Sequence, residues 1–501
     1  MAAERTRPLT KVPFNLRRTS PTTAPSPSPT PLIQDGSYLE ALGLRLNEGV
    51  SKALAHPSGP SLPGELLSGR RPIPAGRGRT LGILIASYVY FGFAPFQLAH
   101  YIFSELRAAR DSTHLYRAVL RAVHKPLSVL LSNLSALLLP LISSPAFLHP
   151  SAPTLEMPTP NATQLHALAI AGFAGELLSI FDEMALGLDT ENRGDGLKCI
   201  RAGLVSLVGR IVTPLIAGIK AELFPLIDAL ETAPKMTSHK VKGSVHPSII
   251  ALQSSVPVYG RALARYASTH PSHTLLASFL ISIVWRALVA LSHRPMMAQP
   301  SSQEVPAEKG QYTPSSGIPS TSSTGLFALK RGSSRPASPV AASTAAADAK
   351  AVYKIFSHFP RPHTQVAREA VDEAFVDLEA LVSLLETVSD PFFGTNKTAE
   401  QVTGEINNLT DDLPTLIALP VLLRTQCLGG AFDPQARMVA TLLNVSEDAY
   451  RRDYLTGFGR AEQYGPVVAQ RILDEIYSRP IINPSECLVD WLEARVNQTD
   501  H

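Results

Sequence analysis

The chain has 501 residues, of which 45% are hydrophobic and only 17% are charged, and its formal net charge is +3. An average soluble domain carries roughly 25% charged residues, so much of this chain must be covered by a helical core, by a partner or by lipid. The small net charge, and the lack of Lys/Arg runs interleaved with aromatic residues, argue against a nucleic-acid-binding protein. We therefore expect protein partners and no nucleic acid.

Residues 1–36 form a basic segment rich in Pro, Ser and Thr, which predicts a disordered tail. No apolar stretch of a secretory signal follows the basic residues, so we expect a cytoplasmic chain. Residues 37–79 combine a short helical pattern at 38–55 with a proline-rich connector. The end of this connector carries arginines suited to an anionic lipid or an acidic partner, namely Arg70, Arg71, Arg77 and Arg79.

Residues 80–293 are predicted to form an apolar helical domain. Proline and glycine residues divide it into helices expected at 79–108, 112–144, 162–188, 195–231, 247–268 and 272–292. No segment is typical of a strand-turn-strand unit. The sequence therefore predicts an all-α fold made of irregular multi-helix bundles.

Four stretches of this domain are apolar enough to raise the question of a membrane: 81–103, 127–148, 202–223 and 274–291. Two of them contain full charges, Arg210 and Lys220 in one and Arg286 in the other. Each such charge costs ~2.5–3.5 kcal/mol at the centre of a spanning helix. These two stretches are therefore not expected to span a membrane.

The stretch 127–148 is uncharged, but Ser128, Ser132 and Ser135 recur at helical spacing. A polar stripe of this kind favours a buried or interfacial helix over a spanning one. We expect a soluble or peripheral core, with an integral membrane hairpin at 81–148 as the alternative.

Residues 294–347 return to a Pro/Ser-rich composition without an apolar period, which predicts a disordered linker. Both polar segments place serines between basic residues and proline. Ser20 in the tail and Ser338 in the linker are the preferred candidates for phosphorylation, because a phosphate there would cancel nearby positive charge.

Residues 348–498 are predicted to form an acidic helical bundle with helices at 399–409, 413–428, 434–444, 446–457, 460–478 and 485–497. Ahead of these, one helix face carries apolar residues in steps of three and four, including Val371, Leu378, Leu381 and Leu385. Such a face predicts either the core of the bundle or an interface with a partner helix.

The sequence contains only weak matches to catalytic, metal-binding and cofactor-binding motifs. Cys199, Cys427 and Cys487 fit no zinc spacing, and the acidic segment 189–196 lacks two ligands of a calcium loop, so neither a metal nor another cofactor is predicted. No HExxH or GxSxG pattern occurs. We expect a non-catalytic helical adaptor or scaffold that binds partner proteins, with membrane-surface contact; an integral membrane protein and an enzyme of unrecognised type are the alternatives.

Overall fold

The computed structural model describes residues 32–55, 98, 100–150, 152–188, 197–232, 245–294, 345–390, 393, 397–426, 439–478 and 485–497. Every regular element in these ranges is a helix, so the predicted all-α fold is confirmed. The N-terminal half contains α1 (Leu32–Ala55), a helical segment at 100–108, α4 (Thr113–Ile142), α5 (Pro145–Leu148), α6 (Ala162–Glu183), α7 (Lys198–Asp228), η1 (Ala229–Glu231), α8 (Pro247–Tyr266) and α9 (His270–His293). The C-terminal half contains α10 (Ala345–Phe356), α11 (Gln365–Val388), α12 (Ala399–Thr410), α13 (Thr415–Gln426), α14 (Val439–Leu442), α15 (Glu447–Tyr454), α16 (Phe458–Ser478) and α17 (Glu486–Asn497).

Helix boundaries follow the polar and proline signals of the sequence. α6 begins where it was expected, because the Asn161 side chain accepts from the Gln164 backbone N–H and the Gln164 side chain accepts from the Asn161 N–H, at 2.9 and 3.1 Å. α1 begins at Leu32, directly after the last proline of the tail and earlier than expected. Only the four-residue α14 lies in the expected helix at 434–444, of which residues up to 438 fall outside the described ranges.

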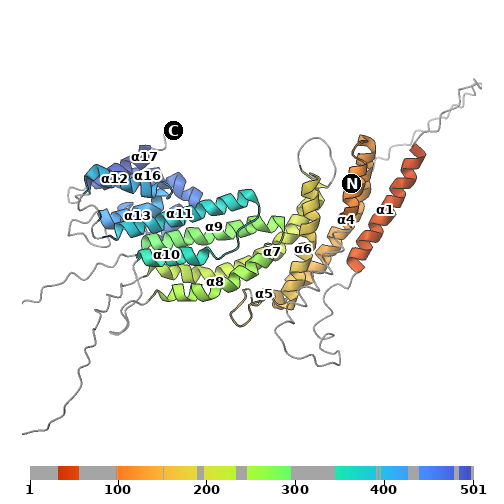
Figure 1. Ribbon diagram of the computed structural model, residues 1–501, viewed down its shortest axis with the longest axis horizontal. Helices are drawn as coiled ribbons and strands as arrows, with labels where there is room; N and C mark the ends of the chain where they lie inside the picture. The colour runs from red at the N-terminus through yellow and green to blue at the C-terminus, as the bar shows by residue number, and fades with distance from the viewer. Residues whose placement is uncertain are drawn as a thin grey trace, which may run out of the picture.

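Three groups of helices follow one another along the long axis of the molecule (Figure 1). The first group, here called the N-terminal limb, consists of α1, residues 100–108, α4, α5 and α6. The second group contains α7 to α11 side by side, and the third contains α12, α13, α16 and α17. α7 packs against both α6 and α9, so it joins the limb to the middle of the molecule. One contiguous hydrophobic cluster runs through all three groups.

α6 approaches the start of α9 closely at Gly175. A Cβ atom at this position would lie 2.2 Å from Cγ2 of Thr269, which is far inside van der Waals contact. Only glycine therefore fits where the limb meets the turn between α8 and α9.

α9 packs on α10, α11 and α13, so the two folded regions expected at 80–293 and 348–498 share an interface. At this interface the indole N–H of Trp285 donates to the carbonyl of Leu455 at 2.9 Å. The guanidinium of Arg451 donates to both carboxylate oxygens of Glu231, at 2.8 and 2.5 Å. These polar contacts fix the orientation of the C-terminal helices on the middle group.

A buried ion pair joins the two ends of the segment 295–344. Arg294, at the end of α9, donates to the carboxylate of Asp348 in the first turn of α10, and both side chains are 3% exposed. An acidic side chain in the first turn is also favoured by the helix dipole. The pair therefore holds α9 and α10 together, whatever the length of chain between them.

Candidate functional site

The four apolar residues predicted to be a core or an interface lie inside the protein. Val371, Leu378, Leu381 and Leu385 are each at most 1% exposed, and their helix α11 contacts α9, α10, α12 and α13. Neighbouring helices of the same chain cover these four side chains, so this face of α11 offers no free surface for a partner. The arginines Arg70, Arg71, Arg77 and Arg79 and the serines Ser20 and Ser338 lie outside the described residues.

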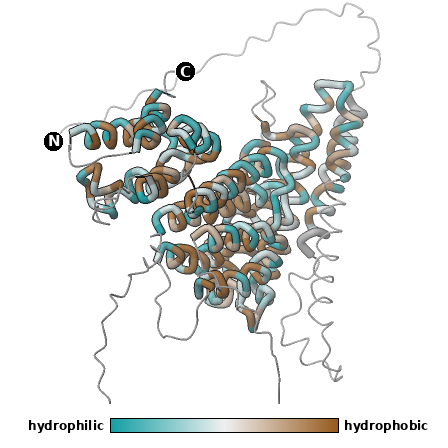
Figure 2. Tube along the Cα trace, turned by 60° about the vertical axis from the view of Figure 1, so that its left-hand side comes forward, coloured by the Kyte–Doolittle hydropathy of each residue, from teal (hydrophilic) through white to brown (hydrophobic). Residues whose placement is uncertain are grey.

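Four described helices are long and apolar enough to cross a membrane: Thr113–Ile142 (α4), Ala162–Glu183 (α6), Lys198–Glu231 (α7 with η1) and His270–His293 (α9). In α9, 61% of the apolar window is buried by the rest of the protein, whereas in α4 only 28% is buried. Hydrophobic and hydrophilic residues alternate along the packed helices of the molecule (Figure 2). This composition is compatible with membrane association, and α4 is the helix that leaves most of its apolar window uncovered.

Charged groups on α7 and α9 meet at a water-accessible surface. Arg286 and Asp228 form an ion pair at 2.5 Å, with side chains 42% and 45% exposed. The Arg286 guanidinium also lies 4.2 Å from the centroid of the Phe224 ring. Because an exposed ion pair would be costly in hydrocarbon, this part of α7 and α9 is suited to water.

Among the described residues, the far end of the N-terminal limb carries the largest group of exposed apolar side chains along a short stretch of chain. We call this group the apolar tip; its members and exposed fractions are Leu137 (38%), Leu139 (60%), Leu148 (45%), Leu155 (65%) and Met157 (55%). They come from the end of α4, from α5 and from the loop before α6 (Figure 1). Glu156 is the only charged residue between positions 126 and 175.

Hydrogen bonds from the first turn of α6 stabilise the conformation of the apolar tip. The Gln164 side-chain amide donates to the carbonyls of Phe147 and Pro150, at 3.1 and 2.9 Å, and is itself 4% exposed. Phe147, in α5, is buried. The fold of this loop therefore rests on buried groups, and the exposed leucines beside it are free to contact something else.

Serine hydroxyls at the end of α4 are satisfied without water. Ser135 donates to the carbonyl of Leu131, Ser143 to that of Leu139 and Ser144 to that of Leu141, at 2.8, 2.8 and 2.7 Å. Ser128, Ser132 and Ser135 all face outward on α4. A serine hydroxyl that donates to a carbonyl of its own helix can be placed in an apolar environment at a small cost in free energy.

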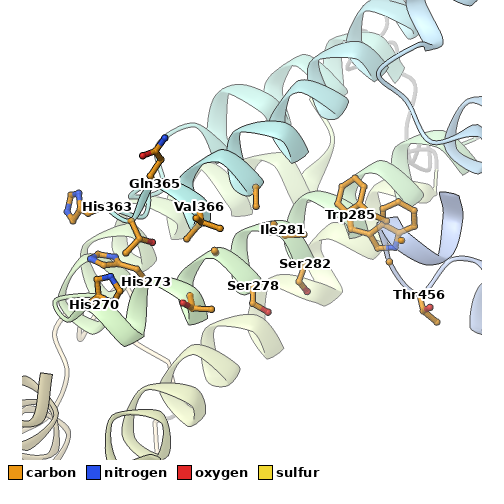
Figure 3. Close-up of a pocket in the computed structure, with 18 residues that line it drawn as sticks. His270, His273, Ser278, Ile281, Ser282, Trp285, His363, Gln365, Val366 and Thr456 are labelled. Atoms are coloured by element: carbon orange, nitrogen blue, oxygen red, sulfur yellow. The ribbon is translucent and has the colours of Figure 1, made fainter. Parts of the chain in front are cut away.

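A groove of about 1200 Å³ lies between α9, the start of α11 and the residues that precede and open α16. His270, His273 and His363 gather at one end, and Trp285 and Thr456 lie at the other (Figure 3). The rings of His273 and His363 are 5.0 Å apart, edge to face. Burial lowers the pKa of His273, and the neighbouring His363 and His270 lower it further, so the site favours the neutral imidazole.

Ser278 and Ser282 also line the groove, between the histidines and Trp285 (Figure 3). Within the described part of the chain, no hydrogen bond joins either serine to a histidine of the groove. No group of three or more His, Cys, Asp or Glu residues is placed to hold a metal ion among the residues that the structure describes.

Comparisons of the chain with protein-family models, with curated proteins and with solved structures found no match. Function is therefore inferred from the surfaces of this chain alone.

Proposed function

We propose that the protein is a non-catalytic helical scaffold that rests on a membrane surface through its apolar tip and holds partner proteins at a distance from that membrane. The observation that carries the proposal is the tip itself. Its five large apolar side chains, between 38% and 65% exposed, lie within residues 137–157, and the surrounding segment 126–175 carries a single charge. A soluble protein rarely exposes such a group without a contact that covers it.

The expected strength of this contact favours reversible binding. Full burial of one such side chain contributes about 1.5–3 kcal/mol, so five side chains that are roughly half exposed contribute about 4–8 kcal/mol in total. This range is similar to that of one myristoyl chain, which binds a bilayer only marginally. A scaffold attached in this way would leave and rejoin a membrane surface.

Lipid is favoured over a protein partner at the tip because the surface offers few polar groups to recognise. The hydroxyls of Ser143 and Ser144 beside it already donate to carbonyls of α4, and Glu156 is the only charge of the segment 126–175. Protein interfaces normally carry about one hydrogen bond per 100–200 Å² of contact. The tip is therefore better suited to the acyl chains of a lipid layer than to a protein surface that presents hydrogen-bonding groups.

The rest of the molecule supports the scaffold part of the proposal. One continuous core connects the limb to the C-terminal helices, and the ion pair between Arg451 and Glu231 fixes their orientation. A partner bound to the C-terminal helices would therefore stay at a defined distance from the tip.

Flotation of the purified full chain with phosphatidylcholine vesicles tests the proposal. The double variant Leu139→Glu/Leu155→Glu is expected to bind at least about tenfold more weakly, because two apolar contacts are lost and two charges must leave water. Equal binding of the variant and the natural chain would contradict lipid contact at the tip.

Ile250→Glu/Val467→Glu is the matched control, since these residues are 57% and 49% exposed on α8 and α16, away from the limb. This variant is expected to float like the natural chain. Carbonate treatment separates the integral alternative, because a peripheral scaffold is released by it and an inserted hairpin is retained.

A further inference from the structure

Three arginines line one pocket at the end of the N-terminal limb opposite the apolar tip. Arg107 comes from the helical segment before α4, Arg110 from the turn that follows it and Arg117 from the second turn of α4. The end of α6 closes the pocket from the other side with Glu183 and the two residues after it. The chain therefore brings three guanidinium groups together from the turn that joins two helices.

None of these three arginines has an acidic partner among the described residues. Arginines elsewhere in the same structure are paired, as Arg201 is with Asp182 and Arg286 with Asp228. Glu183 is the one carboxylate that lines the pocket, and it leaves an excess of two positive charges over the lining residues. Each guanidinium presents five N–H donors in a planar fork, which suits bidentate bonds to phosphate oxygens.

Apolar and aromatic side chains form much of the remaining wall of the pocket. Phe103, Tyr116 and Leu120 lie along it, and the volume is about 570 Å³. Small-molecule sites typically have volumes of about 300–1,000 Å³ and combine apolar walls with a few polar groups. Thr113, in the first turn of α4, also lines the pocket, so the positive end of the α4 dipole faces the same space.

We infer that this pocket binds a small organic ligand that carries two or more phosphate groups. Arg107, Arg110 and Arg117 bind the phosphates, and the rings of Phe103 and Tyr116 contact the carbon skeleton. The site goes beyond the proposed scaffold role, and it does not depend on lipid contact at the tip.

Two kinds of ligand carry phosphate groups on a carbon skeleton in this way: a soluble organic polyphosphate and the headgroup of a phosphorylated lipid. α4 has 30 residues and is therefore about 45 Å long, with the pocket near its start and the tip at its end. A headgroup would thus come from a second membrane rather than from the one beneath the tip.

Calorimetric titration of the full chain with inositol hexakisphosphate and with ATP tests the soluble source. Vesicles of phosphatidylcholine with a phosphorylated inositol lipid, compared with phosphatidylcholine alone, test the lipid source. We expect saturable binding to at least one probe. Single variants Arg107→Gln, Arg110→Gln and Arg117→Gln are each expected to weaken it about tenfold, because each removes charge-assisted hydrogen bonds.

Arg121→Gln is the matched control, since Arg121 is exposed one turn further along α4 and does not line the pocket. It is expected to change affinity less than about twofold, as a screened surface charge does. All four arginines lack ion pairs among the described residues, so thermal unfolding of the variants without ligand should match the natural chain. Failure to bind any of the probes, or equal weakening by Arg117→Gln and Arg121→Gln, would overturn the inference.

Discussion

Replacement of Asp348 with alanine is expected to lower the free energy of unfolding by about 3–5 kcal/mol, because it leaves the buried Arg294 guanidinium without its counter-charge. Both side chains are only 3% exposed, so water cannot replace the lost partner. The pair also joins the two ends of the segment 295–344, and its loss should loosen α10 from α9. Urea denaturation followed by circular dichroism measures the effect.

A double variant distinguishes a buried charge from a simple packing defect. Arg294→Met/Asp348→Leu removes both charges and keeps apolar volume, and replacements of this kind are often neutral or stabilising. We expect it to recover most of the stability lost by Asp348→Ala. If the double variant is as unstable as the single one, or if the single variant is as stable as the natural chain, this explanation is wrong.

Asp377 on α11 is expected to make stability fall as pH rises from about 4 to 7. Burial, as the largest cause, and the nearby charges of Glu373, Asp412 and Glu462 together raise the pKa of this carboxyl to about 7. The folded state therefore binds a proton that the unfolded chain has lost in this range. The stabilisation is fully present below the unfolded pKa and disappears as pH passes through the folded value.

Asp377→Asn mimics the protonated side chain at every pH. At pH 8 it is expected to raise the free energy of unfolding by roughly 2–4 kcal/mol relative to the natural chain, and near pH 4 the difference should vanish. Asp490→Asn, on the exposed face of α17, is the control and should show no such pH dependence. A constant effect of Asp377→Asn from pH 4 to 8 would contradict the raised pKa.

Most helices could be predicted because their limits are local. The capping box of Asn161 and Gln164 and the proline after His270 are readable from a few residues, and the apolar stripe around Leu378 shows which face of α11 is buried. Helix ends depend on neighbouring residues, so a linear sequence contains the information.

The contacts that join distant helices could not be predicted in the same way. Trp285 meets Leu455 and Arg451 meets Glu231 across 170 and 220 residues of chain. Nothing in the local pattern selects these partners from the many others of the same type. The interface between the two expected domains was therefore missed.

The surfaces with a proposed role were only partly visible in the sequence. The uncharged stretch 127–148 was recognised as apolar, but its break into α4 and α5, and the exposure of Leu155 and Met157 beside it, depend on the loop that Gln164 holds. The arginine pocket needs the end of α6 against the start of α4, which no spacing along the chain indicates.

The most direct measurement is the fluorescence of an environment-sensitive dye placed at the tip. With the native cysteines replaced, Leu155→Cys labelled with nitrobenzoxadiazole should shift to shorter wavelength and brighten when phosphatidylcholine vesicles are added. The same dye at Val366→Cys, a position 79% exposed on α11, should not respond. An unchanged spectrum at position 155, or equal shifts at both positions, would contradict a scaffold that meets lipid through its apolar tip.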